Sequence, residues 1–222
     1  MTLHQSETKS MNIFDPFFKR LQRRASRDQA FNPYKDPYLR NNLKFYFEYL
    51  YGINQNQILL IGEAPGYKGC RLTGIPFSSC DLIQSSQHKL FKHLRKKIVL
   101  QESASENTAA MVWEQLEDKK IIPIFWNAFP FHPFNKGKQN SNRAPSTKEV
   151  EEGQWYIKEL IKIFEPKTIA AIGRKGEQAL QKLDLKTEIK YIRHPSYGGK
   201  SDFIKHINEV MSLDTKYSQT AK

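Results

Sequence analysis

Short, nearly continuous apolar runs recur along the chain, and each one leads into a turn-forming segment. The four clearest runs are QILLIG at 57–62, IIPIFWNAF at 121–129, KTIAAIG at 167–173 and EIKYIRHPS at 188–196. Apolar runs of this length with few charges are typical of strands that are buried on both faces of a parallel sheet. We therefore predict four strands at these positions.

The segments between the runs carry apolar residues at helical spacing. The expected helices cover residues 41–52, 81–100, 174–183 and about 201–212. One more helix is expected after Ser146, because Ser146 and Glu149 have the spacing of a capping box. Strands that alternate with helices imply an α/β fold. The sequence thus predicts a three-layer α/β/α sandwich with a mainly parallel four-stranded central sheet.

The first part of the chain differs in composition from the rest. Residues 1–40 are polar and basic, with FKRLQRRASR at 18–27 and a proline-broken loop at 31–39. We expect them to form an N-terminal arm or a helix packed on the domain. Residues 41–215 contain no internal repeat and no linker, so we expect them to form a single domain.

The charge suggests the kind of partner. The chain of 222 residues has 35 basic and 23 acidic side chains, a formal net charge of +12. Such an excess favours a polyanion, most commonly nucleic acid, although a merely basic protein is the plainer alternative. We expect the partner to be DNA, single- or double-stranded, and the protein to act as a monomer.

Other function classes are disfavoured by what the sequence lacks. No apolar run approaches the roughly 18–20 residues that span a bilayer, and the N-terminus has no apolar signal core. Two cysteines, Cys70 and Cys80, are too few for a disulfide framework or a four-cysteine metal site. We therefore expect a cytoplasmic protein with no membrane contact, no metal and no cofactor.

Polar segments follow three of the four predicted strands. These segments are GEAPG at 62–66, WNAF at 126–129 and RHPS at 193–196. Ligands of parallel α/β sheets bind outside the carboxyl ends of the strands. Each segment alone is weak evidence, but their convergence at one sheet edge predicts a functional site.

Several segments, in order, resemble the uracil-DNA glycosylase superfamily over roughly residues 57–212, most closely its iron–sulfur family. They are GEAPG at 62–66, GIPF at 74–77, WNAFPFHP at 126–133, NRAPSTKEVE at 142–151, EPKTIAAIGRKGEQAL at 165–180 and RHPSY at 193–197. The chain departs from that family in two ways. The cluster cysteines are missing, with Phe131 and Gly153 in two of their places. Three positions after GEAPG, where that family carries an acidic residue, this chain has Gly69.

The resemblance implies a DNA repair glycosylase. Phe77 would stack on an extruded base, and His194 would stabilise the negative charge left on that base. Asn127 can pair with O4 and N3–H of uracil through one amide, which would mismatch cytosine. Glu63, the nearest remaining carboxylate, is a candidate for activating water, although it could equally cap a helix or orient the loop.

The remaining candidates form the base pocket and the DNA surface. The bare turn of the base pocket comprises Gly62, Ala64, Pro65 and Gly66. The candidate DNA contacts are Arg143, Ser196, Tyr197 and Lys200. Two other functions stay open. One is a catalytically weak or inactive member that only binds nucleic acid, and the other is an enzyme acting on free nucleosides.

Overall fold

The computed structural model describes residues 13–27, 29–53, 58–196 and 198–217. Its centre is a four-stranded sheet in the order β3–β2–β5–β6, in which every pair of neighbours is parallel. The strands are β2 (Ile58–Gly62), β3 (Ile124–Asn127), β5 (Thr168–Ile172) and β6 (Ile189–Ile192). All four predicted strands are present, and the predicted α/β fold class is confirmed.

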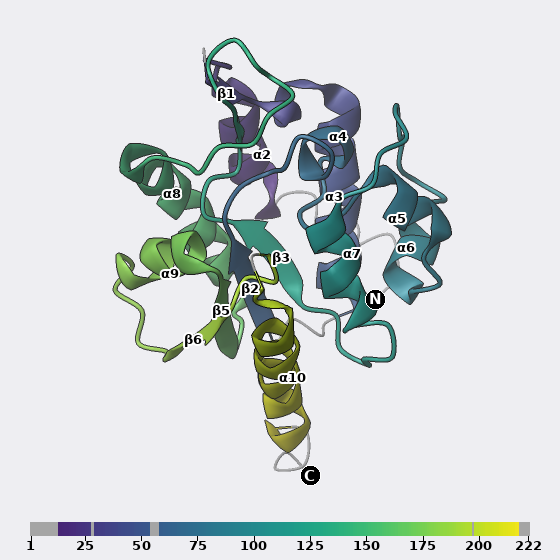
Figure 1. The fold of residues 1–222 in the computed structure, drawn as a ribbon, viewed down its shortest axis with the longest axis vertical. Helices are drawn as coiled ribbons and strands as arrows, with labels where there is room; N and C mark the ends of the chain where they lie inside the picture. Colours follow the sequence, from purple (N-terminus) through teal and green to yellow (C-terminus); the bar gives the residue numbers. More distant parts are fainter. Residues whose placement is uncertain (1–12, 28, 54–57, 197, 218–222) are drawn as a thin grey trace.

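Helices cover both faces of this sheet (Figure 1). Helices α8 and α9 lie on one side of the sheet, and α3, α5, α6 and α7 lie on the other. The bounds are α2 (Asp15–Arg23), α3 (Pro37–Gly52), α4 (Cys70–Thr73), α5 (Cys80–Ser85), α6 (Lys89–Leu94), α7 (Asn107–Glu114), α8 (Thr147–Phe164), α9 (Arg174–Gln181) and α10 (Lys200–Tyr217), with a short 3-10 helix η1 at Pro33–Lys35. Strands β2, β3 and β5 are buried along their whole length, whereas three of the four residues of the edge strand β6 are half-buried.

The predicted long helix over 81–100 was wrong. The chain forms α5 and α6 instead, with a break between them. At the break, the Ser86 hydroxyl accepts a hydrogen bond from the His88 amide, and His88 Nδ1 accepts one from the Leu90 amide. These side-chain bonds compete with continuation of the first helix and start the second one. The predicted capping box before α8 is confirmed by reciprocal bonds between Ser146 and Glu149.

The N-terminal segment is part of the core as far as the structure describes it. Helix α2 buries Phe14, Phe17 and Leu21, each at most 1% exposed. The ring of Phe17 packs edge-on against Trp126 of β3 and Tyr156 of α8. A two-stranded sheet also pairs β1 (Ala30–Phe31) with β4 (His132–Pro133). Within the described part of this segment, helix α2 therefore packs on β3 and α8.

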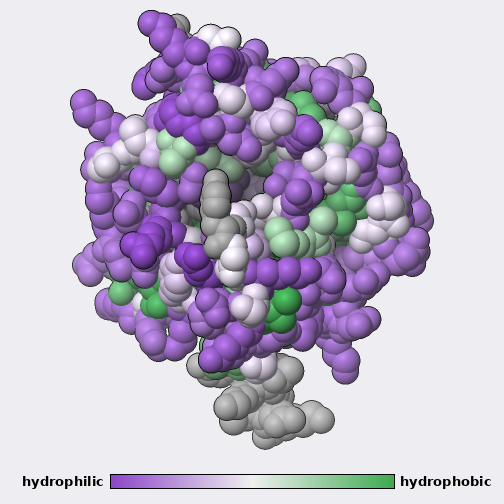
Figure 2. All heavy atoms as spheres, in the orientation of Figure 1, coloured by the Kyte–Doolittle hydropathy of each residue, from purple (hydrophilic) through white to green (hydrophobic). Residues whose placement is uncertain are grey.

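The outer surface is mainly hydrophilic on the face shown in Figure 2, where apolar residues are scattered in small patches. Large apolar side chains with substantial exposure are Ile13, Tyr38 and Val99 among the described residues. No helix in the described ranges is both long and apolar enough to cross a membrane.

Helix α8 approaches the end of β3 very closely. A Cβ atom on Gly153 would lie 1.7 Å from the carbonyl oxygen of Ala128 and 3.3 Å from the Cα atom of Phe129. Only a glycine permits this approach, because the obstructing atoms belong to the backbone. Gly153 therefore sets how closely α8 can approach the segment that follows Asn127.

Gly153→Ala should destabilise the fold by about 3 kcal/mol, the upper end of the usual overpacking cost, because neither backbone can move easily. Gly52→Ala is the matched control, since a Cβ there meets nothing within 4 Å. The control should raise stability by less than about 1 kcal/mol. Urea unfolding of both variants measures the difference, and equal midpoints would contradict the close approach.

Candidate active site at the carboxyl edge of the sheet

A cavity of about 450 Å³ lies at the carboxyl ends of the sheet strands. Residues at or just after the carboxyl end of each of the four strands line it, namely Glu63, Asn127, Gly173 and His194. Phe77 and the turn residues Ala64, Pro65 and Gly66 also line it. The structure thus brings together all of the predicted catalytic and base-binding residues except Gly62, which lies directly behind Phe77.

Gly62 leaves room for the ring of Phe77. A Cβ atom on Gly62 would lie 2.4 Å from Cζ of Phe77 and 3.2 Å from Oδ1 of Asn127. Phe77 also has a positive φ of 53°, which is uncommon for a bulky residue. Its carbonyl accepts a 2.7 Å hydrogen bond from Nε1 of Trp113, and its ring packs on Phe125. The surrounding contacts therefore hold Phe77 in a strained conformation beside the cavity.

Asn127 presents an unused amide to the cavity. The residue is 4% exposed, and its side chain makes no hydrogen bond within the described part of the chain. A strand-end asparagine that merely bonded the backbone would have its amide occupied. A nearly buried amide without a partner is costly, so this one is suited to a ligand that supplies both a donor and an acceptor.

His194 is held as a neutral ring. Its Nδ1 accepts a 3.2 Å hydrogen bond from the backbone amide of Ser196, so in the neutral ring the proton resides on Nε2. Burial lowers the pKa of His194 below its ordinary value, and the positive charge of Arg193 adds to this, while the negative charge of Glu106 opposes it. The ring therefore offers an N–H donor at neutral pH.

Glu63 is a partly buried carboxyl group on the first turn. Burial raises its pKa above the ordinary value, and the positive charge of Lys175 opposes that effect. Its side chain makes no hydrogen bond to any other described residue. A carboxylate in this environment is more basic than a solvated one, which suits proton transfer.

The cavity contains residues that the sequence analysis missed. Among them are Glu106, Asn142, Arg174 and Arg193. Oδ1 of Asn142 accepts a 2.9 Å hydrogen bond from the amide of Tyr67 and so ties the long loop to the first turn. Asn142, Arg174 and Arg193 lie within segments that carry the resemblance, but nothing in the sequence singled them out from their neighbours. Glu106 lies in none of those segments, and its surroundings in the sequence show only polarity and helix propensity.

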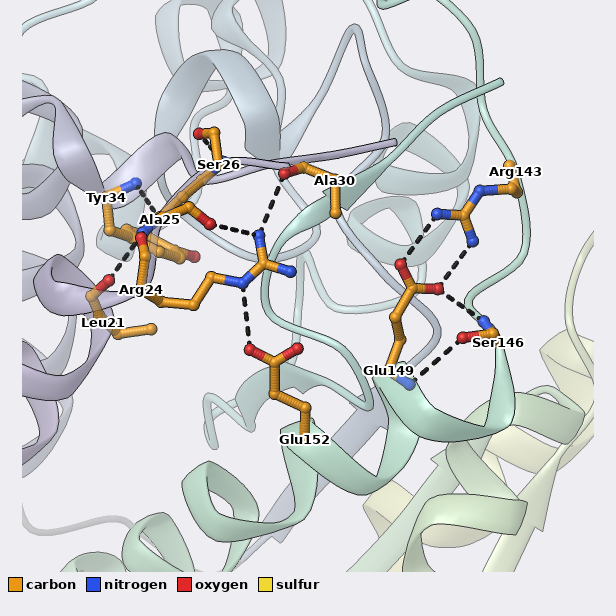
Figure 3. Close-up of polar contacts among 11 residues, drawn as sticks. Leu21, Arg24, Ala25, Ser26, Ala30, Tyr34, Arg143, Ser146, Glu149 and Glu152 are labelled. Atoms are coloured by element: carbon orange, nitrogen blue, oxygen red, sulfur yellow. Dashed lines mark hydrogen bonds and ion pairs between the residues drawn. The ribbon is translucent and has the colours of Figure 1, made fainter. Parts of the chain in front are cut away.

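Arg143 lies at the edge of the cavity but is fully engaged within the protein. Its guanidinium makes a bidentate ion pair with Glu149, at 2.7 and 2.9 Å (Figure 3). Its other donors bond the carbonyls of Phe134, Ala144 and Gln29. These bonds use all five N–H groups of the side chain. The expected phosphate contact therefore lacks a free donor, and Arg143 holds the long loop onto α8.

The other predicted DNA contacts differ in position. Ser196 lines the cavity and donates its amide to His194. Lys200 is exposed at the start of α10, with Nζ 3.9 Å from a carboxylate oxygen of Glu114. Tyr197 lies outside the described residues. Gly199 approaches the His194 backbone closely, because a Cβ atom on Gly199 would lie 2.2 Å from the carbonyl oxygen of His194.

The residues do not fit an iron–sulfur cluster. Phe131, in one expected ligand position, is fully buried against Tyr156, and the guanidinium of Arg24 lies 4.4 Å from its ring centroid. Gly153, in another, has no room for a side chain. Both cysteines are buried, and burial raises the pKa of Cys70 to about 12. Within the described ranges no three His, Cys, Asp or Glu side chains form a metal-binding group.

The geometry at His194 predicts a defined titration. At pH 7 Nε2 should carry the proton and Nδ1 should not, and because the pKa is lowered, the ring should stay neutral below the ordinary midpoint of 6.5. Protonation at lower pH would put a proton on Nδ1 and break the bond from Ser196. Nitrogen-15 spectra of the histidine side chains measure this, with His194→Gln to assign the signals. A midpoint above 6.5 would contradict the arrangement.

Comparisons with known proteins agree with this fold. A structure described as wild-type SMUG2 from Pedobacter heparinus superposes with a TM-score of 0.64 at 16% identity, covering 93% of this chain and 98% of that one. A comparison with curated proteins gave no match. Residues 50–211 match the sequence profile of the Uracil DNA glycosylase superfamily. That match spans most of the chain, including every strand of the sheet and the candidate catalytic residues, so the protein belongs to the Uracil DNA glycosylase superfamily.

Proposed function

We propose that the protein is a DNA repair glycosylase that removes uracil, or a related deaminated base, and leaves an abasic site. One observation carries this proposal: the side-chain amide of Asn127, which has no hydrogen-bond partner among the described residues, lines the same cavity as the neutral ring of His194. An amide with free donor and acceptor suits the pairing edge of a base. A neutral N–H donor suits an oxygen on which negative charge develops.

Base recognition would depend on two side chains. Phe77 offers an aromatic surface, and stacking of a base on such a surface contributes about 1–3 kcal/mol for any base. Selectivity would come from Asn127, whose amide can match the O4 acceptor and the N3–H donor of uracil. The same amide orientation would leave cytosine with an unpaired polar group, at a cost of roughly 1–3 kcal/mol.

Bond cleavage would proceed by departure of the base as an anion. As the bond between C1′ of the sugar and N1 of the base lengthens, its electron pair moves onto the base and collects largely on O2. The Nε2–H of His194 would stabilise that oxygen, and comparable donors contribute about 2.7–4 kcal/mol. Water would then add to C1′, assisted by Glu63 or by the main chain of the turn, and no metal or cofactor would take part.

DNA is the proposed partner because of charge as well as family. The net charge of +12 supplies a sequence-independent attraction to phosphates. Arg174 and Arg193 border the cavity, and Lys200 is exposed close by in the chain. The turn at Ser196 has small side chains and backbone amides, which suit close contact with a phosphate backbone.

His194→Ala should lower the rate of uracil release from DNA about 100- to 1,000-fold in single-turnover assays, because one oxyanion donor is lost. Asn127→Ala should weaken discrimination of uracil from cytosine in a competition assay by about 10-fold or more. The matched control is His93→Ala, on α6 and outside the cavity lining. Wild-type protein that binds DNA but releases no base would favour the binding-only alternative.

The same protein preparation distinguishes a DNA glycosylase from the alternative of an enzyme that acts on free nucleosides. It expects turnover of free deoxyuridine and binding that barely changes with salt. The DNA proposal expects affinity that falls with salt, with a logarithmic slope near −0.9 per phosphate contact on duplex. Oligonucleotides that carry uracil, hypoxanthine or xanthine, in single and double strands, identify the preferred base and strand.

Gly62→Ala should abolish most activity without removing any catalytic side chain. Its Cβ would meet the Phe77 ring at 2.4 Å, so the ring must leave the position in which it faces the cavity. We expect at least a 10-fold loss of affinity for uracil-containing DNA over undamaged DNA, in line with the worth of one stacking contact. Gly52→Ala is the control, because a Cβ atom there meets nothing within 4 Å. Gly137→Ala is unsuitable, because Gly137 has a positive φ of 73°, which strains any other residue. Unchanged selectivity in Gly62→Ala would contradict stacking on Phe77.

A further inference from the structure

A second carboxylate occupies the space beside Gly69. A Cβ atom on Gly69 would lie 3.1 Å from Cγ and 3.4 Å from Cβ of Glu106. Gly69 and Glu106 both line the cavity that also contains Asn127 and His194. The aliphatic part of the Glu106 side chain therefore lies beside the position where a side chain on residue 69 would begin, as does the carbonyl oxygen of Ser78 at 3.0 Å. Glu106 reaches that position from a different element, the residue preceding α7.

The carboxylate of Glu106 is held in a fixed orientation. Oε1 accepts a 3.0 Å hydrogen bond from the amide of Thr108, and Oε2 accepts a 2.7 Å bond from the amide of Ala109. Each oxygen keeps a further lone pair, so both can accept another hydrogen bond. A preorganised carboxylate of this kind loses little entropy when it binds a water molecule.

The segment leading into Glu106 is also held in place. The carboxylate of Asp81 accepts a 2.6 Å hydrogen bond from the Ser103 hydroxyl and a second one from the Ser105 hydroxyl. The amide of Asp81 donates a 3.2 Å bond to the carbonyl of Ala104. These contacts span the three residues before Glu106. They fix the path of the chain and thereby the position of Glu106 in the cavity wall.

The charge of Glu106 acts on the catalytic histidine. Its negative charge raises the pKa of His194, which places the carboxylate within electrostatic reach of that ring. Glu63 differs, because burial raises its own pKa and the positive charge of Lys175 acts against that rise. Of the two cavity carboxylates, Glu106 is the one that accepts hydrogen bonds from backbone amides.

We propose that Glu106 is the carboxylate that binds and activates the attacking water, a role that rests on the proposed glycosylase function. The bond between C1′ and N1 breaks, and its electron pair leaves with the base. The water oxygen then bonds to C1′ while Glu106 takes one of its protons. The base anion later takes a proton from solvent, and Glu106 returns its proton to solvent. Glu63 then serves to orient the turn.

Variants at Glu106 separate this role from helix capping. Glu106→Gln keeps the length of the side chain but removes the charge. Glu106→Asp keeps the charge and is a strong N-cap, but it withdraws the carboxylate by one methylene. If Glu106 only caps α7, both folded variants should release uracil from DNA at the wild-type rate. Glu63→Gln is the matched control on the other cavity carboxylate.

We expect Glu106→Gln to lower the single-turnover rate of uracil release about 100-fold or more, the usual contribution of a general base. Glu106→Asp should be folded, as judged by thermal melting, and slower than wild type by at least 10-fold. The affinity of both Glu106 variants for DNA that carries a non-hydrolysable uracil nucleotide should stay within about twofold of the wild-type affinity. Glu63→Gln should lose less rate than Glu106→Gln.

Two outcomes overturn this inference and differ in what they leave standing. Wild-type rates in folded Glu106→Asp together with a larger loss in Glu63→Gln would assign the water to Glu63 and retain the glycosylase. A wild-type protein that releases no base from any tested substrate would remove the proposed function and this inference with it. Should Glu106→Gln fail to fold, the rate of Glu106→Asp alone decides between the two roles.

Discussion

The ring of Phe77 lies against the end of β2 in a space that only a residue without a side chain leaves open. A Cβ on Gly62 would sit 2.4 Å from that ring, and Oδ1 of Asn127 is the next nearest obstruction. Gly62 is paired with Asn127 across the β2–β3 register, so both side-chain positions lie at the same level of the sheet. The stacking surface and the amide therefore share one wall of the cavity because one residue is glycine.

That constraint accounts for the unusual backbone at Phe77. Its φ of 53° is unfavourable for a bulky side chain and persists only where the surroundings fix it. Two contacts do so: the indole of Trp113 donates to its carbonyl, and Phe125 supports its ring. Strain held in this way positions the ring before a ligand arrives. Less of the binding energy is then spent on ordering the site.

Two arginines connect α8 to neighbouring segments of the chain. Arg24 donates to Glu152 of α8 and to the carbonyls of Ala25 and Ala30 (Figure 3). Its guanidinium carbon also lies 4.4 Å from the ring centroid of Phe131. Arg143 joins the long loop to Glu149 of the same helix. A planar guanidinium can bond several groups in one plane, so two such side chains hold α8, the N-terminal segment and the long loop together.

The sequence predicted the sheet well because buried parallel strands leave a direct signature, continuous apolar runs such as ILLIG. The prediction failed where side-chain hydrogen bonds determine the end of a helix. The break between α5 and α6 at Ser86 and His88 is such a case, and the spacing of apolar residues does not reveal it. The prediction also failed for Arg143, because the ion pair with Glu149 depends on the path of the loop. Glu106 was missed for a similar reason, since its approach to Gly69 joins segments that share no motif.

The neutral state of His194 bears on what the nearby carboxylate can do. Burial and Arg193 lower the pKa of the ring, and Glu106 raises it, with burial the largest of these effects. Had the charge of Glu106 dominated, a protonated ring would form and neutralise that carboxylate as an ion pair. Because burial dominates, the ring donates a hydrogen bond without carrying charge, and it places no positive charge beside Glu106. In the proposed reaction, a sugar that gains positive charge as its base leaves would then meet a neutral ring and a carboxylate.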